Sequence, residues 1–483
     1  MGTILDQYGR TYAYKAARGA QWTQSRPWEP VERKDIEDLV PHCDRKTLLS
    51  HARRIYLNFG PIKKAVNDRS MYAVGRAFVP KYCGKDSEWG QQAAELLVNK
   101  FYPIGDVRGG MHDFKTNLFT WSSSLDVDGE VFILLTQTPQ GFPQYQGIPS
   151  HRIATPEGMK DGERVKGGEL KDGIVYHKSG APKFYAFVDK KGELAKWLPA
   201  QDIIHLYDPE WQQQGRGITA LAHCINDCRD MIQSTEWERL AMLQMSSISM
   251  IETNEHGGPD PDDPYTSLSE VGSGDKGLTV QSMDGGTVRY FRSGSGGKIE
   301  ALQNTRPGNP FLEFHERLLR SAYAGLGWPY AFYSGHGVGG GTAQRTEIAM
   351  AQRSIEDRQD LLFYAAKRII GYAVAKLQKR GDLPQGGEWW RWEFSTPPKL
   401  TIDDGRVTKD LETMWKSGAV NMRDMVEMRG GTYEDHVRSR CVDLAKAKLI
   451  KNQVESEYGV QIDDREVSMM TPNEQPENDT QNQ

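Results

Sequence analysis

The sequence has no long apolar run, little cysteine and no excess of positive charge. No stretch approaches the ~18 consecutive apolar residues of a membrane-spanning helix, so we predict no contact with a membrane. The cysteines number five in 483 residues, and their odd, scattered set is typical of reduced thiols rather than a disulfide framework. The net charge is −5, whereas a protein that grips DNA tightly usually presents a basic face. A DNA-binding protein that lets DNA slide past is not excluded.

The common catalytic motifs are also missing. The sequence has no H-E-x-x-H pattern, and Ser334-Gly335-His336 is not a nucleophile elbow. The glycine-rich segment there ends Gly341-Thr342-Ala343, without the lysine of a phosphate-binding P-loop. We therefore predict no catalytic residue and no cofactor.

Two patterns raise the question of a bound metal. Asp126, Asp128 and Glu130 form an acidic cluster, but Glu130 opens an apolar run and no twelve-residue calcium loop follows. We interpret the cluster as a turn into a strand. Cys224 and Cys228, with His223 beside them, supply too few ligands for zinc. We therefore predict no metal site.

The most informative stretch has no proline between Pro329 and Pro384. It begins with a glycine-crowded loop, 334–344, and continues as a predicted helix, 342–380. Along this helix one apolar stripe recurs at seven-residue spacing, with alanines on neighbouring positions, while the rest is polar. The stripe consists of Ile348, Ile355, Leu362 and Ile369, with Ala351, Ala366 and Ala373. A long helix introduced by a glycine loop suits a part that moves or lines something.

The remaining patterns predict an α+β chain. Before the long helix, periodicity and turn residues predict helices over 46–59 (with Asp44 as N-cap), 62–74, 89–101, 111–125, 219–245 and 311–327. Strands are predicted over 130–136, 153–155, 173–177, 184–188 and 203–207. An insert over 249–300, rich in Gly, Asp, Ser and Pro, holds strand-like pieces at 277–281 and 287–291. A strand at 389–394 and helices at 405–417, 421–429 and 433–458 follow.

Five segments occur in an order that resembles one family. They are His51-Ala-Arg-Arg-Ile-Tyr-Leu-Asn-Phe-Gly-Pro61 with Val74-Gly75; Asp128-Gly-Glu-Val-Phe132; Asp172-Gly-Ile-Val-Tyr176 with Gly180-Ala-Pro-Lys-Phe-Tyr185; His205-Leu-Tyr-Asp-Pro209 with Gln214-Gly-Arg-Gly-Ile218; and Gly325-Leu-Gly-Trp-Pro-Tyr330. Each is loose alone, but the series resembles the lambda-like family of phage portal proteins over about residues 35–450.

The resemblance implies a portal fold with wing, helical stem, β-rich clip and α-helical crown. The implied divisions are an extended arm (1–30), wing (31–217), stem helix (218–248), clip (249–305), second stem helix (306–328), wing with tunnel loop and tunnel helix (329–404), crown (405–460) and a disordered tail (461–483). Three consecutive glycines, 339–341, depart from the bulkier polar residues usual in the tunnel loop.

The same resemblance implies a dodecameric ring at one vertex of a virion, assembled in the host cytoplasm. The ring would pass double-stranded DNA without reading its sequence, and would dock the terminase large subunit, then a head–tail adaptor, and a capsid or scaffold protein. The implied channel residues are Ser334, His336, Gly339, Gly340, Gly341 and Arg345. The implied docking residues of the clip are Asp260, Asp262 and Asp263, which the flanking prolines hold extended.

Two other functions remain open on the sequence alone. One is a monomeric metal-dependent enzyme, and the other is a monomeric binding module that uses the acidic insert as its recognition loop. Either would be small in solution, whereas a portal would assemble into a ring.

Overall fold

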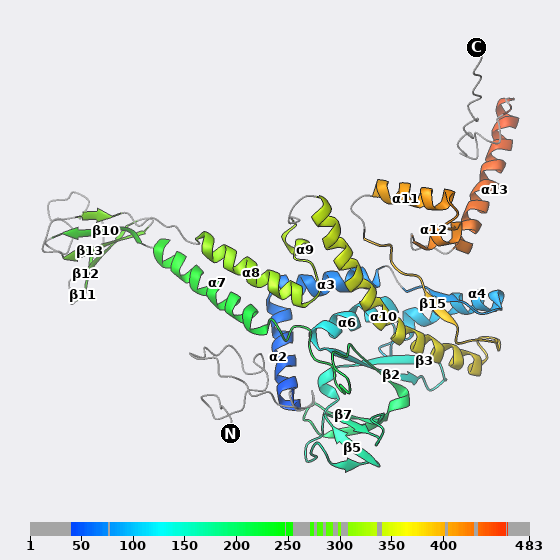
Figure 1. Cartoon of the computed structure of the whole chain (residues 1–483), viewed down its shortest axis with the longest axis horizontal. Helices are drawn as coiled ribbons and strands as arrows, with labels where there is room; N and C mark the ends of the chain where they lie inside the picture. The colour runs from blue at the N-terminus through cyan, green and yellow to red at the C-terminus, as the bar shows by residue number, and fades with distance from the viewer. Residues whose placement is uncertain are drawn as a thin grey trace. The chain divides into compact units, whose positions relative to one another are not determined.

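The computed structural model describes residues 40–75, 78–246, 248–254, 271–274, 278–283, 286–292, 298–300, 308–335, 341–400, 404–428, 433–459 and 461 (Figure 1). The chain folds as two units. One comprises Met1–Met71, Asn117–Thr136 and Tyr145–Ala365, and the other comprises Tyr72–Thr116, Gln137–Gln144 and Ala366–Gln483. Helices and strands occur in both units, which confirms the predicted α+β class. None of the described helices is long and apolar enough to cross a membrane.

The first described helices follow the predicted pattern with one correction. Helix α2 (His42–Asn58) begins after Pro41, and Asp44 lies in its first turn. The prediction of Asp44 as N-cap is therefore wrong. A carboxylate in the first turn still stabilises the helix by interacting with the positive end of its dipole. Helix α3 (Gly60–Val74) has Pro61 in its first turn, where proline is well tolerated. Helix α6 (Phe114–Val127) leads into the first long strand.

Two antiparallel helices lie side by side farther along the chain. Helix α7 (Ile225–Ser246) contacts α8 (Asn309–Gly325), and the Ser234 hydroxyl lies 2.9 Å from Nε2 of His315. The prediction that α7 begins at Thr219 is wrong. The segment before it is held as turns, because Thr219 Oγ1 and the Ala220 amide both donate to the Asp126 carbonyl.

Two antiparallel sheets share one core in the first unit. The three-stranded sheet has the order β3-β2-β9, and the five-stranded sheet has the order β4-β5-β6-β7-β8. Buried Phe132, Ile174, Tyr185 and Leu198 belong to one apolar cluster that joins them. The strands are β2 (Glu130–Gln137), β3 (Pro143–Ile148), β4 (Arg164–Val165), β5 (Gly168–Lys171), β6 (Ile174–Tyr176), β7 (Pro182–Val188), β8 (Leu194–Pro199) and β9 (Ile203–Tyr207), with short 3-10 helices η3 (Ser150–Arg152) and η4 (Ala200–Asp202).

The predicted strands of this region are confirmed except one. The prediction of a strand at 153–155 is wrong, because Ile153 makes only an isolated bridge to Phe187. Strands β3, β4, β5 and β8 were not predicted. Their outward positions are polar, and a short half-exposed strand gives a weak alternation signal.

A third sheet lies in the chain between α7 and α8. Its strand order is β11-β12-β13-β10-β14, and β10 runs parallel to β13. Strands β12 and β13 confirm the two predicted strand-like pieces. The strands are β10 (Ile248–Asn254), β11 (Val271–Gly274), β12 (Leu278–Met283), β13 (Gly286–Arg292) and β14 (Lys298–Glu300). The insert is therefore β-rich, as its composition indicates.

The second unit combines a small aromatic core with helices. Strands β1 (Pro80–Tyr82) and β15 (Trp392–Phe394) pair antiparallel, and the ring of Trp89 lies 5.0 Å from that of Tyr82. Helix α4 (Ser87–Leu96) continues as the π-helix η2 (Leu97–Phe101) and α5 (Tyr102–Ile104). The C-terminal helices are α11 (Asp404–Lys416), α12 (Met422–Met428) and α13 (Tyr433–Tyr458), close to the predicted bounds.

The long helix is present where the proline-free stretch predicts it. Helix α10 (Gly341–Arg380) follows the short α9 (Ala331–Ser334). Ile355, Leu362 and Ile369 of its stripe are buried, as are Ala351, Ala366 and Ala373. The narrow apolar stripe is therefore the packed side of this helix.

We expect Leu362→Ala to destabilise the chain by about 2–5 kcal/mol, because it removes a fully buried side chain and leaves a cavity. Equilibrium denaturation measures the change. Tyr364→Ala, which truncates a side chain that is 54% exposed on the same helix, is the control and should cost much less. Equal losses in the two variants would show that the stripe is not the packed side.

Candidate functional site

Glu130 lies where the backbone at Gly129 closely approaches the backbone at Gly217 and Ile218. Gly129 has φ +82°, and a Cβ there would lie 2.2 Å from the Ile218 carbonyl carbon. A Cβ on Gly217 would meet the Gly129 oxygen at 2.2 Å. Only glycine permits this approach. It brings Arg216 against the first residue of β2.

Glu130 is fully buried and is surrounded by donors. Arg216 donates to it through Nε at 2.9 Å and Nη2 at 2.5 Å, and Arg45 of α2 donates through Nη1 at 3.2 Å. The Ser150 hydroxyl donates at 2.5 Å, and Nε2 of His205 lies 3.0 Å away. The Gly217 amide completes the set at 3.0 Å. Both carboxylate oxygens are therefore occupied by protein groups.

A second carboxylate balances the charge of the two arginines. Asp172, in the β5–β6 turn, accepts from Arg45 Nε at 2.5 Å and Nη2 at 3.1 Å, and its Oδ1 lies 3.4 Å from Arg216. Burial alone would raise the pKa of Glu130, but Arg216 and Arg45 hold it well below its usual value. Burial lowers the pKa of His205, so its imidazole is neutral at pH 7. This Glu130 cluster is a closed ion-pair network between α2 and the two sheets.

Asp126 and Asp128 have arginines of their own. Arg69 of α3 and Arg358 of α10 donate to Asp126 Oδ1 at 3.0 and 2.5 Å, and Arg53 of α2 makes a bidentate pair with Asp128 at 2.7 Å for each bond. Each carboxylate therefore pairs with different arginines. The interpretation of the acidic cluster as a turn into a strand is confirmed, since Asp128-Gly129 leads directly into β2.

The side chains of His223 and Cys224 contact backbone carbonyls. The ring nitrogens of His223 lie 2.8 Å from the Ala220 carbonyl and 3.1 Å from that of Ala322, in the space left by Gly325 of α8. Burial alone would lower the pKa of His223, but Cys224 and the two carbonyls raise it to about 9. Cys224 donates to the Leu221 carbonyl at 3.3 Å. The histidine thus bridges the start of α7 and the end of α8. Within the described ranges, no three His, Cys, Asp or Glu side chains gather as a metal site would require.

The structure describes only some of the residues that the resemblance assigns to the channel. Ser334 ends α9, Gly341 begins α10, and Arg345 is exposed in the first turns of α10. His336, Gly339 and Gly340 lie outside the described residues, as do the clip residues Asp260, Asp262 and Asp263. Their assignments stay predictions.

The structure also shows residues that the sequence patterns did not single out. Buried Arg45 and Arg358 and half-buried Arg69 lie on helices as charged residues among many others. Arg216 stands between two glycines, and this spacing was the one available signal.

Residues 5–359 match the family described as phage portal protein, lambda family. The chain belongs to this family. The match extends into α10, and it confirms the resemblance drawn from the five segments. No curated protein matches the sequence.

Solved structures resemble this portal protein at low identity. A chain from the neck of an empty gene transfer agent particle, computed with C6 symmetry, is 11% identical with a TM-score of 0.48, over 80% of this chain and 94% of that one. A chain from the native particle's neck, computed with C12 symmetry, is 12% identical with a TM-score of 0.45, over 79% and 92%. An HK97 family phage portal protein from Corynebacterium diphtheriae is 12% identical with a TM-score of 0.31, over 64% and 88%.

We expect Glu130→Gln to destabilise this portal protein by about 3–5 kcal/mol at pH 7, because it removes one of the two carboxylates that neutralise the buried Arg45 and Arg216. The depressed pKa of Glu130 means that its contribution is present above the unfolded value of 4.5 and is lost as pH falls through the folded value. The difference between variant and parent should therefore shrink in acid.

Denaturation of both proteins across acidic and neutral pH measures this difference. Glu169→Gln is the matched control, because Glu169 is exposed in β5 and pairs with Lys171 at the surface. A constant difference at all pH values would contradict the electrostatic account.

Proposed function

We propose that this portal protein forms a dodecameric ring through which double-stranded DNA enters the procapsid during packaging and later leaves it. Family membership establishes the portal role, and one structural observation supports the ring. The α7–α8 pair carries large apolar side chains that nothing in the described residues covers. They are Trp237 (64% exposed), Leu240 (55%), Leu243 (66%), Leu312 (53%) and Phe314 (57%).

Apolar exposure on this scale indicates a protein contact. Soluble monomers rarely leave large contiguous apolar patches open. Trp237, Leu240 and Leu243 recur every three residues, so they share one side of α7. A ring, in which each copy repeats the same contact with the next, covers such a surface in every subunit.

The elements suit the parts of a portal. Residues 218–248 and 306–328 contain α7 and α8 and form the stem, and 249–305 contain the five-stranded sheet and form the clip. Residues 31–217 form the wing, 329–404 add its tunnel loop and tunnel helix α10, and 405–460 form a crown of α11, α12 and α13. These divisions rest on the order of the elements along the chain.

A channel for DNA needs weak contact that ignores sequence. Each tightly neutralised phosphate would add drag, so a net charge of −5 suits passage better than a basic wall would. Arg345 is exposed beside the glycine loop. Repeated by the ring symmetry, it forms a circle of positive charge that touches phosphates.

The partners follow from this role. The clip, with Asp260, Asp262 and Asp263, docks the terminase large subunit and then the head–tail adaptor, and the ring joins a capsid or scaffold protein at one vertex of the virion. The role is structural and mechanical, without catalysis. The buried ionisable groups described above support this view, because they are engaged with one another.

Ring assembly should depend on the exposed face of α7. We expect Leu243→Glu to convert the ring to smaller species, because it places a charge at every repeat of an apolar contact. Mass photometry measures the outcome against a parent particle of about twelve times 54.5 kDa.

Thr235→Glu adds the same charge on a different side of α7, where Thr235 is exposed, and should leave the ring intact. A parent chain that stays monomeric at every salt and protein concentration would contradict the proposed ring. A ring unaffected by Leu243→Glu would exclude this face as the contact.

Arg345→Gln should leave the ring intact but impair DNA packaging or retention, because it removes one positive charge from every subunit at the channel. Packaged DNA per particle measures the effect. Lys379→Gln, at the other end of α10 and also exposed, is the control and should package normally. Loss of the ring in Arg345→Gln would instead show that the arginine braces the assembly.

A further inference from the structure

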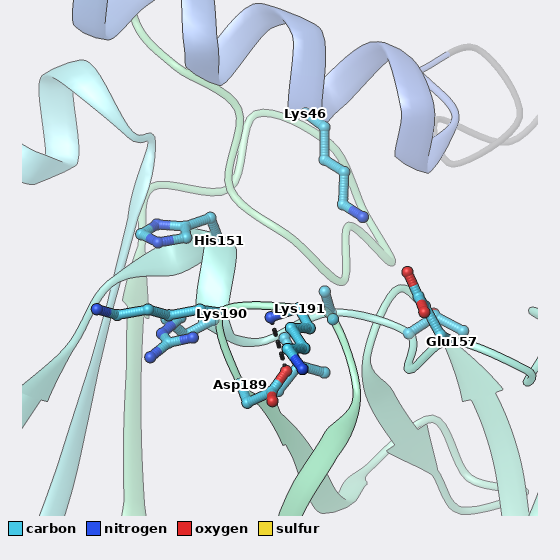
Figure 2. A pocket seen from close by; sticks show the side chains of 11 residues that line it. Lys46, His151, Glu157, Asp189, Lys190 and Lys191 are labelled. Carbon is cyan, nitrogen blue, oxygen red and sulfur yellow. Dashed lines mark hydrogen bonds between the residues drawn. The ribbon is translucent and has the colours of Figure 1, made fainter.

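A recess lies between helix α2 and the turn that joins β7 to β8. Its volume is about 490 Å³, and its lining includes Lys46, Arg152, Lys190 and Lys191 together with Glu157 and Asp189. Figure 2 shows Lys46 extending down from α2, with Glu157 at the right of the view and Lys190 at the left. Basic side chains from three separate elements thus converge on one hollow.

The lysines of this recess are not neutralised. Lys46, Lys190 and Lys191 are exposed, and none of them forms an ion pair within the described part of the chain. Asp189 is already engaged, because its Oδ1 accepts from the amides of Lys191 and Glu193 at 2.8 and 2.9 Å. The pKa of His151 is lowered by burial and by Arg53, so its ring adds no charge at pH 7. The recess therefore keeps an excess of positive charge.

The recess continues along α2. A second hollow of about 470 Å³ shares Lys46 and His151 with the first, and is also lined by Leu49, Arg53, Arg54 and Leu57. The α2 residues recur at intervals of three and four, so they share one face of the helix. Leu57 at the far end is 69% exposed. The two hollows together make one groove with basic side chains along its length and the exposed apolar side chain of Leu57 at one end.

We propose that this α2 groove binds an extended acidic peptide segment of a partner protein, with an apolar side chain of that segment against Leu57. Acidic side chains complement Lys46, Lys190 and Lys191, and this match is the main support. A DNA duplex fits less well, because a rigid double helix is too wide to enter a recess of about 490 Å³. The site does not depend on the proposed ring or channel.

Fluorescence anisotropy with the full-length protein tests the site. The probe is a fluorescein-labelled synthetic peptide of alternating Glu and Leu, and a Lys–Leu peptide of equal length is the charge control. We expect the acidic probe to bind, the basic probe to fail, and affinity to fall as salt rises. The double variant Lys190→Glu/Lys191→Glu should weaken binding by roughly tenfold or more, through like-charge repulsion.

Two further variants separate the groove from general surface charge. Lys196→Glu changes an exposed lysine of β8 outside the groove and should bind like the parent. Leu57→Ala should weaken the acidic Glu–Leu probe but leave a Glu–Ser probe unchanged. Equal loss in Lys196→Glu and in the double variant would overturn the proposal.

Other occupants give distinct results that also overturn it. A labelled DNA duplex that displaces the peptide, and whose binding falls in the double variant, would make the groove a phosphate site. A change of particle mass in the double variant by mass photometry would make it a contact between copies of this chain. Failure of the acidic probe to bind the parent would remove the site altogether.

Discussion

The arrangement of the first unit depends on the buried charge of Glu130. This carboxylate and Asp172 share Arg45 and Arg216, and the four groups come from α2, β2, the β5–β6 turn and the loop after β9. A buried charge is tolerated only when it is paired and hydrogen-bonded, so the partners have to arrive together. The cluster thereby fixes where α2 and both sheets meet, and α2 also lines the basic groove.

The Asp126 cluster offers a contrast. Two guanidinium groups, from Arg69 and Arg358, converge on one oxygen of Asp126. Its other oxygen and both arginine Nε atoms have no hydrogen-bond partner among the described residues. Arg358 lies on α10, so an ion pair with Asp126 links the long helix to α6. This pair leaves hydrogen-bonding atoms unused, whereas both oxygens of Glu130 accept hydrogen bonds in the cluster that contacts α2.

Sequence patterns predicted what is local and periodic. The stripe from Ile355 to Ile369 locates α10, because burial repeats with the helical period. The five segments identify the family by their order along the chain, although each segment alone is only loosely similar. The start of α7 was placed too early, since the turns at Thr219 are held by the distant Asp126 carbonyl. Arg45 and Arg216 meet Glu130 only after folding, and no spacing along the chain encodes a pair 85 residues apart. The α2 groove was missed for the same reason.

An electron cryomicroscopy reconstruction of the purified full-length protein tests the central claim most directly. The account predicts a closed ring in which the α7 face with Trp237 and Leu243 packs against the neighbouring copy, and in which Arg345 faces a central channel. Monomers, or a ring that leaves this α7 face in solvent and turns Arg345 away from the axis, would contradict it.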